Sequence, residues 1–178
     1  MALTNHAGTL KTFWRLIESY GHQPEPLFKT LLLDINLAED PNARIPYSKV
    51  EALWKATILL VNDPYLGLKI PSCWHPSAAG SLGYAWLSSS SLKTAFERLI
   101  RFTRVITDGA HFRIEENNDE FSIIQSFSKD TSDIPEMVDA QLALLVNLCR
   151  LNYSQNLNPL AISFTHSATK EPGEYFSF

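Results

Sequence analysis

The sequence predicts an α+β fold, with a helical N-terminal half followed by an antiparallel sheet and a long helix packed on it. Two observations lead to this prediction. Through about the first 70 residues, apolar residues recur every three to four positions, which is the spacing of amphipathic helices. After residue 109 the pattern changes to the alternation typical of strands. A parallel nucleotide-binding fold is disfavoured, because its strands would alternate with helices from the start.

The composition is that of one globular domain, which we take as residues 1–178. The chain has 178 residues, 45% of them hydrophobic and 19% charged, which suits a packed core and is unlike a disordered chain. A net charge of −4 disfavours direct binding to nucleic acid. Neither a secretory signal nor a membrane-spanning run is seen. Cys73 and Cys149 match no metal spacing, so we expect reduced thiols in a cytoplasmic protein.

Two helices are predicted before residue 40. Apolar residues recur at helical spacing from Leu10 to Ile17, and Gly21 is placed to end this helix in a left-handed cap. Pro24 introduces the second helix. The polar stretch at residues 39–42 then breaks the helical pattern.

The next two helices are predicted from their first residues. Ser48 and Glu51 have the spacing of a capping box at the start of a third helix. Asp63 followed by Pro64 has the residue types of an N-cap and a first helical position. We therefore expect a short fourth helix to begin there.

The long helix is predicted to start at Leu92. Apolar residues at helical spacing give it one apolar face, while three arginines project from its other sides. A run of serines, residues 88–91, comes directly before it. No G-x-S-x-G turn surrounds these serines, so we interpret them as helix caps and loop residues rather than as nucleophiles.

The second half of the chain contains the predicted sheet. Residues 111–116 and 121–127 flank a polar turn and are typical of an antiparallel hairpin. A helix is then predicted from Pro135 to about Tyr153. Residues 160–166 alternate strictly between apolar and polar or small side chains, so we expect a final strand there.

The segment from Gly80 to Trp86 combines glycines with aromatic residues. Gly80 and Gly83 lack the preceding strand and the third glycine of a phosphate-binding turn, so we interpret them as positions where a helix packs closely. Ligand pockets are lined mainly by hydrophobic and aromatic side chains. We therefore consider Tyr84 and Trp86 either as core residues or as pocket lining.

Three further residues are candidates for binding a ligand. Arg101, beside Phe102 on the long helix, either faces solvent or turns inward to pair with an acidic ligand. His166 continues the apolar face of the last predicted strand, either as a half-buried imidazole or as a polar group at a pocket mouth. Metal, cofactor and catalytic residues are not predicted, because the five histidines show no metal-ligand spacing and no acid–base or nucleophile pair is evident.

The order and spacing of these motifs resemble the N-terminal effector-binding and dimerisation domain of AraC-type bacterial transcription regulators, in the arabinose-binding-domain branch. The R-I-P element of that branch is matched by Arg44-Ile45-Pro46, and its V-x-F-x-H element is matched at residues 162–166. The strongest likeness is in three consecutive segments: Asp63–Leu68 (DPYLGL), Gly80–Ala85 (GSLGYA), and the helix from Ser91-Leu92 to Arg101-Phe102.

The resemblance implies a domain that binds a small-molecule effector and forms a homodimer, without enzymatic activity and without membrane contact. It also implies DNA binding through a C-terminal helix-turn-helix domain, which we expect to lie outside these 178 residues. Sugar, amino acid, fatty acid and second messenger all stay open as effectors. Two alternatives of another class stay open as well: a haem- or lipid-binding sensor module, and a small cytosolic enzyme that uses the same cavity.

Overall fold

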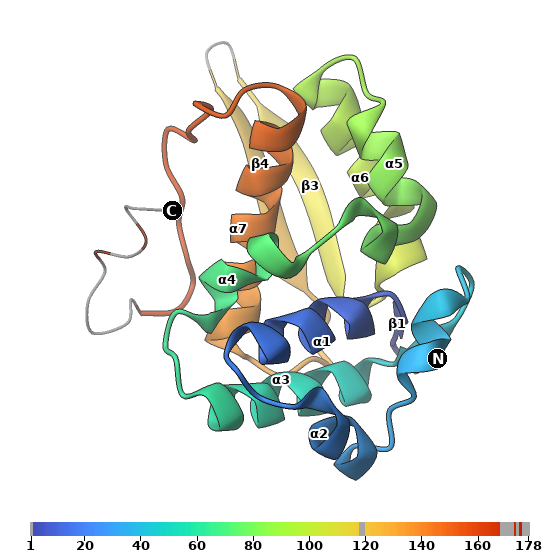
Figure 1. The fold of residues 1–178 in the computed structure, drawn as a ribbon. Helices are drawn as coiled ribbons and strands as arrows, with labels where there is room; N and C mark the ends of the chain where they lie inside the picture. The colour runs from blue at the N-terminus through green and yellow to red at the C-terminus, as the bar shows by residue number, and fades with distance from the viewer. Residues whose placement is uncertain (1, 118–119, 168–172, 174, 176–178) are drawn as a thin grey trace.

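A computed structural model describes residues 2–117, 120–167, 173 and 175 and shows an α+β fold, as predicted (Figure 1). The N-terminal half is helical and carries one short strand pair, the second half contains a hairpin, and a long helix follows the hairpin. In chain order the elements are β1 (Thr4–His6), α1 (Thr9–Ser19), α2 (Pro24–Thr30), η1 (Ile35–Glu39), β2 (Arg44–Pro46), α3 (Tyr47–Val61), α4 (Leu66–Cys73), η2 (Pro76–Ala79), α5 (Gly80–Leu87), α6 (Leu92–Ile106), β3 (Ala110–Glu116), β4 (Phe121–Phe127) and α7 (Pro135–Asn152).

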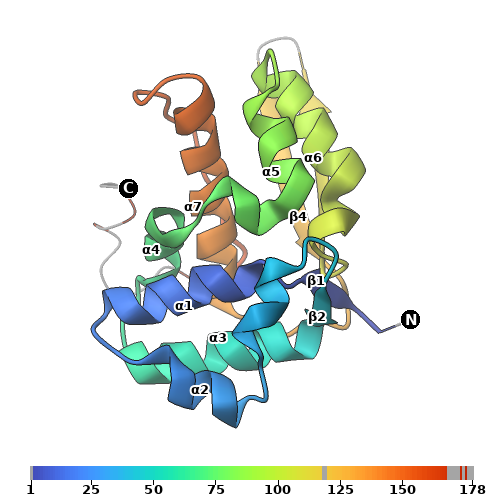
Figure 2. The same cartoon turned by 45° about the vertical axis from the view of Figure 1, so that its right-hand side comes forward.

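The helices form a base and two walls. In Figure 1 the helices α1, α2 and α3 lie across the lower part of the molecule, and the hairpin β3–β4 rises above them. Figure 2 shows α7 on one side and the pair α5–α6 on the other, both standing above α1. This arrangement brings helices from both halves of the sequence into contact, as where α4 packs against α7.

The strands form two separate antiparallel pairs. In the first, β1 pairs with β2, with Asn5 opposite Ile45. In the second, β3 pairs with β4 over seven residues, from Ala110 opposite Phe127 to Glu116 opposite Phe121. Among the described residues both sheets have two strands, so helix packing rather than a large sheet organises the core.

Arg44 joins the first strand pair to the end of α6. Its guanidinium donates to the backbone carbonyls of Arg104 and Val105, at 3.1 and 2.8 Å, and therefore satisfies carbonyls that the end of a helix leaves unpaired. It also donates to an Asp108 carboxylate oxygen at 3.2 Å. The arginine of the R-I-P element thus acts as a C-terminal helix cap in this structure.

Buried apolar residues form two clusters. The first core lies among α1, α2, α3, α4 and the first turn of α7, and includes an edge-to-face contact of Phe13 with Trp54 at 4.8 Å. The second core lies among α5, α6 and the second half of α7, and includes an edge-to-face contact of Trp86 with Phe96 at 4.9 Å. The long helix α7 belongs to both clusters.

Several predicted helix ends are confirmed and two are wrong. Gly21 follows α1 with φ of +78°, and the Ser91 hydroxyl accepts from the backbone N–H of Thr94 at 3.2 Å. The capping box is wrong: α3 begins at Tyr47 with no side-chain cap, and the Glu51 carboxylate accepts from the backbone N–H of Ser132 instead. The helix follows β2 without a loop, so the backbone N–H of Tyr47 is already used by the carbonyl of Leu3.

The start of α4 also differs from the prediction. The helix begins at Leu66, not at Pro64, and Asp63 caps the turn before it by accepting from the backbone N–H of Tyr65 at 2.8 Å. The other carboxylate oxygen accepts from the hydroxyl of Tyr20 at 2.5 Å. Because Asp63 is also held by Tyr20, its position is set by α1 as much as by α4.

The final strand predicted at residues 160–166 is not formed. These residues take part in no strand pair within the described chain, and Leu160 is 92% exposed. The segment is attached by side chains instead: Phe164 packs on the ring of His166, and His166 binds Asp139 of α7. Strict alternation predicts two faces, but a strand also needs a neighbouring strand edge, and no described strand pairs with this segment.

Candidate functional site

A cavity of about 200 Å³ lies between the two cores. Its lining residues include side chains of α1 and α3 and of α5, α6, β3 and α7. Figure 2 shows α1 and α3 beneath α7 and the pair α5–α6. A single water molecule requires roughly 10–15 Å³ of such space, so this cavity has room for an organic molecule. It is lined by Asn5, Thr9, Thr12, Phe13, Tyr47, Val50, Trp54, Ile70, Trp74, Ala78, Ala79, Leu82, Gly83, Trp86, Leu99, Thr103, Ile106, Thr107, Ala110, Phe112, Met137, Ala140, Gln141, Leu144, Leu145 and Leu148.

Every lining residue is uncharged at neutral pH. Among the residues that line the cavity there is no aspartate, glutamate, lysine, arginine or histidine. The most acidic group is the phenol of Tyr47, and burial, assisted by the charge of Glu51, raises its pKa to about 12. The cavity therefore offers aromatic and aliphatic surface with a few neutral polar groups, and it lacks the acid–base pair that most hydrolytic or transfer reactions use.

Some of the polar lining groups are already paired. The Thr103 hydroxyl donates to the carbonyl of Leu99 at 2.5 Å, and the Thr107 hydroxyl accepts from the backbone N–H of Gly109 at 3.0 Å. The Asn5 amide donates to the carbonyl of His6 at 3.1 Å. These bonds fix backbone turns around the cavity.

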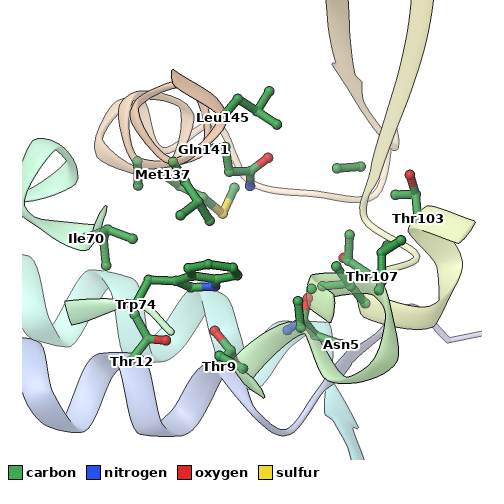
Figure 3. A pocket seen from close by; sticks show the side chains of 18 of the residues that line it. Asn5, Thr9, Thr12, Ile70, Trp74, Thr103, Thr107, Met137, Gln141 and Leu145 are labelled. Atoms are coloured by element: carbon green, nitrogen blue, oxygen red, sulfur yellow. The ribbon is translucent and has the colours of Figure 1, made fainter. Parts of the chain in front are cut away.

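Five other polar lining groups have no hydrogen-bond partner among the described residues: the hydroxyls of Thr9 and Thr12, the indole N–H groups of Trp54 and Trp74, and the side-chain amide of Gln141. Figure 3 shows the Trp74 indole between α1 and α7, with the two threonines on one side of it and Gln141 on the other. The free groups thus come from α1, α3, α7 and the residue after α4, and they line one cavity.

The close approach of α5 to η2 depends on glycine. A Cβ added at Gly83 would lie 2.1 Å from the carbonyl oxygen of Pro76, which no side chain could accommodate without a backbone shift. Gly80, which has φ of +55°, begins the helix. The interpretation of these glycines as close-packing positions is therefore consistent with the structure, and the packing places Leu82 and Trp86 in the cavity wall.

The structure places Trp86 in the cavity wall, where its indole N–H donates to the carbonyl of Leu148 at 3.2 Å and ties α5 to α7. Tyr84, two residues earlier on the same helix, is 55% exposed and is not part of the lining. The two aromatic residues of this segment therefore point in different directions.

The arginine candidate lies on the outside of α6. Arg101 is exposed, and its guanidinium stacks over the ring of its neighbour Phe102, 5.4 Å from the ring centre. Neither residue lines the cavity. The arginine of this helix that does turn inward is Arg98, and it is occupied by the carbonyl of Ala85 at 2.9 Å and the hydroxyl of Ser89 at 3.0 Å.

The histidine candidate is bound to a buried carboxylate. The Nε2 atom of His166 lies 2.9 Å from Oδ1 of Asp139, whose side chain is 1% exposed. The Tyr175 hydroxyl donates to the other oxygen of Asp139 at 2.6 Å. We call His166, Asp139 and Tyr175 the α7 latch, because they attach the C-terminal segment to α7. Of the five predicted site residues, the structure places Trp86 in the cavity, and a ligand role for the other four stays a prediction.

Sequence reasoning did not single out Trp74, Gln141 or the two threonines. A usable signal exists for the threonines, because Thr9 and Thr12 share the helical face of α1 with the buried Phe13. For Trp74 and Gln141 no local signal distinguishes them from ordinary core residues. Their position becomes apparent only when α4 and α7 are brought together.

No histidine or cysteine side chain is among the residues that line this cavity. None of the five histidines lines it, so a haem bound there would lack a histidine ligand. Among the described residues no group of three histidine, cysteine, aspartate or glutamate side chains could hold a metal ion. Both cysteines are free thiols and buried, and burial raises the pKa of Cys149 to about 11, so this thiol stays protonated at neutral pH.

No helix in the described part of the chain has the length and hydropathy that crossing a bilayer requires.

Comparison with known proteins identifies one family and one relative. The family described as the arabinose-binding domain of AraC transcription regulators, N-terminal, matches residues 21–178. The ornithine utilization regulator of Pseudomonas aeruginosa is 31% identical over 91 residues. That match covers 51% of this chain and 27% of the relative, so the matched part spans about a quarter of the relative's length.

Proposed function

The chain belongs to the family of arabinose-binding domains found at the N-terminus of AraC transcription regulators, and we propose that it is the ligand-sensing and dimerising domain of such a regulator. The family is a regulatory one and not an enzymatic one. The observation that carries the proposal is the cavity between the two cores, which has room for an organic ligand and converging free polar groups. DNA would be bound by a separate helix-turn-helix domain of the whole regulator.

The position of the cavity supports a mechanism. A ligand between α1, α5–α6 and α7 would contact both cores and so favour the one arrangement in which all of them touch it. The α7 latch attaches the C-terminal segment to the helix that forms one wall of the cavity. A change in the position of α7 would therefore be passed to the chain that follows, which gives the two sites a physical connection.

Dimerisation is part of the proposal because an effector domain that controls DNA binding commonly does so by setting the spacing of two DNA-binding domains. Several large apolar side chains remain exposed, including Leu32 and Leu59, each 83% exposed. The expected result is a dimer at micromolar concentration, measured by light scattering coupled to size-exclusion chromatography. If both this chain and the whole regulator are strict monomers, the proposal that the domain dimerises is wrong.

The sensing role is tested in the whole regulator with a promoter reporter, across growth media that differ in carbon source. Leu145 lines the cavity and Leu142 on the same helix does not, and both are half-buried, so Leu145→Trp and its control Leu142→Trp are matched. Filling the cavity should abolish the difference in reporter output between media, while the control keeps it. The proposal is wrong if the two variants respond alike and both proteins are folded.

The relative named for ornithine utilization raises the question of an amino-acid effector for this chain. A free amino acid carries at least two charges at neutral pH, and none of the residues that line the cavity can pair with a charge. We therefore do not carry ornithine over as the proposed effector.

A further inference from the structure

We propose that the cavity binds an uncharged, mostly apolar small molecule that carries one or two neutral hydrogen-bonding groups, such as a hydroxyl, a carbonyl or an amide. This inference rests on the proposed function in one respect, namely that the cavity is the effector site. It adds the chemical class of the effector, which neither the family description nor the name of the relative provides.

The first argument is charge. All lining side chains are neutral, and the buried carboxylate of α7, Asp139, is occupied by His166 and Tyr175 in the α7 latch. A carboxylate or ammonium group placed in the cavity would lose its hydration without gaining a partner of opposite charge. Such transfer is costly unless the charge is paired, so charged effectors are disfavoured.

The second argument is the balance of surface. The walls are made mainly of aromatic and aliphatic side chains, including three tryptophans, Trp54, Trp74 and Trp86. A sugar presents a hydroxyl on nearly every carbon, and each buried hydroxyl needs a hydrogen-bond partner. Five lining side chains have a polar group without a partner among the described residues, fewer than the donors and acceptors that a sugar presents and enough for one or two groups on an apolar body.

The third argument is the placement of these free groups. The Trp74 indole donates only, whereas the hydroxyls of Thr9 and Thr12 and the amide of Gln141 both donate and accept. Figure 3 shows Trp74 between the threonines of α1 and Gln141 of α7. A hydroxyl or carbonyl beside the Trp74 indole would find donors and acceptors from two helices, which orients the ligand across the cavity.

A fourth argument, independent of the first three, comes from the β3–β4 hairpin. Both side-chain polar atoms of Gln125 are buried and lack a hydrogen-bond partner among the described residues. Gln125 is paired with Phe112 in the antiparallel ladder, so the two side chains share one sheet face, and Phe112 lines the cavity. A buried amide without a partner is uncommon, and here it lies on the sheet face that the cavity uses. Its amide is neutral, as are the polar groups that line the cavity.

The test uses a probe that is itself neutral. N-phenyl-1-naphthylamine is apolar, carries one N–H, and becomes fluorescent in apolar surroundings, so its binding to the chain can be titrated directly. Three competitors then report the class: 1-octanol, octanoate and L-arabinose, all at pH 8. We expect 1-octanol to displace the probe, octanoate to do so at least ~10-fold more weakly, and L-arabinose not to displace it.

Variants locate the binding and test the charge argument. Leu145→Trp should remove probe binding, and Leu142→Trp should retain it. Gln141→Lys places a cation in the cavity and should reverse the preference, so that octanoate binds more tightly than 1-octanol. Asn147→Lys on the same helix, outside the lining, should leave the preference unchanged. Circular dichroism of each variant establishes that it is folded.

The outcomes separate the two proposals. Equal displacement by octanoate and 1-octanol, displacement by L-arabinose, or absence of probe binding to the folded chain would overturn the inference. A preference for neutral ligands that Leu145→Trp removes would support the inferred ligand class, whatever result the promoter reporter gives. If that preference is found and the whole regulator ignores cavity filling, the sensing role fails while the ligand class stands.

Discussion

Asp139 is the most deeply buried acidic side chain among the described residues, and two other side chains bind it. Asp139 on α7 is 1% exposed and keeps its carboxylate against His166 and Tyr175, at 2.9 and 2.6 Å. Gly67 of α4 makes room for this residue, because a Cβ at Gly67 would lie 2.8 Å from that of Asp139. A carboxylate in such a place depends on its partners, so each partner is expected to matter for stability.

His166→Ala should therefore destabilise the chain. Removing one partner of a buried pair leaves the carboxylate of Asp139 insufficiently compensated, and such losses are about 3–5 kcal/mol. The free energy of unfolding from urea titrations measures this effect. His22→Ala is the control, since His22 is exposed and is expected to change stability by less than about 0.5 kcal/mol. Similar small losses in both variants would show that the α7 latch is not formed in solution.

Asp108 is a partly exposed carboxylate that also depends on its hydrogen-bond partners. Its contribution to the stability of the chain depends on pH. The Thr4 hydroxyl donates to its carboxylate at 2.7 Å and Arg44 at 3.2 Å. The hydrogen bond from Thr4, with a smaller contribution from the charge of Arg44, lowers the pKa of Asp108 against the opposing effect of burial. A carboxyl whose pKa is lowered on folding stabilises the protein above its unfolded pKa, and this stability is lost as the pH falls through the folded pKa.

Asp108→Asn is thus expected to lower stability at pH 7, by about 1 kcal/mol for a partly exposed group that loses charged hydrogen bonds. The difference from the unmodified chain should shrink as the pH falls below the ordinary value for aspartate, about 4, and disappear at lower pH. Urea unfolding at pH 7 and at successively lower pH values measures it. Asp130→Asn is the control at an exposed aspartate. A difference that is constant with pH would refute the role assigned to the charge.

At the scale of elements, close packing of helices determines where the cavity wall stands. Gly83 of α5 lies against the Pro76 carbonyl, and Gly67 of α4 lies against the Glu136 carbonyl and the backbone of α7. Both glycines occur in the segments that resemble the family pattern. Small residues here let backbones approach so that larger neighbours, such as Trp86, reach the cavity.

Gly83→Ala should displace α5 from η2, because the added Cβ would lie 2.1 Å from a backbone oxygen. The expected loss is about 1–3 kcal/mol, typical of overpacking at a close contact. Differential scanning fluorimetry and urea unfolding measure it, and Ser81→Ala, an exposed position of the same helix, is the control. If Gly83→Ala is as stable as Ser81→Ala, α5 does not pack as described.

The elements also show what a sequence can and cannot predict. Helix and hairpin positions follow from local periodicity, so α1, α6, the β3–β4 hairpin and α7 were predicted close to their observed bounds. The segment at residues 160–166 has equally clear periodicity and forms no strand, because pairing requires a partner edge that its own sequence does not encode. The Ser48–Glu51 cap failed for a similar reason, since a strand fixed the start of the helix.

The cavity is the least local feature, and it was the least predictable. Its free polar groups come from α1, from α3, from the residue after α4 and from α7, and they span more than 130 residues of the sequence, from Thr9 to Gln141. Trp86 was one of two candidates from its own segment, with a core position as the alternative, whereas Trp74 and Gln141 look like ordinary residues in theirs. A family resemblance identifies the order of the elements, but it does not say which side chains meet in the middle.

At the scale of the whole molecule, the cavity separates two cores of unequal size. The first core contains the larger set of buried residues, and the second depends on α5, α6 and the end of α7. The elements of the smaller core should open more easily, because fewer buried contacts hold them. Hydrogen exchange measured by mass spectrometry is expected to show lower protection for α5 and α6 amides than for those of α1 and α3.

A neutral ligand should then raise protection on both sides of the cavity, because its contacts exist only when the two cores are together. With 1-octanol at ten times its dissociation constant, the expected stabilisation is about 1.4 kcal/mol, which corresponds to roughly tenfold slower exchange of amides that open with the cavity. The effect should include α1 and α5 together and should be absent in Leu145→Trp. Protection confined to α5 and α6 would mean that the ligand stabilises the second core without connecting it to the first. The domain would then lack the coupling through which a bound effector could reach α7 and its latch.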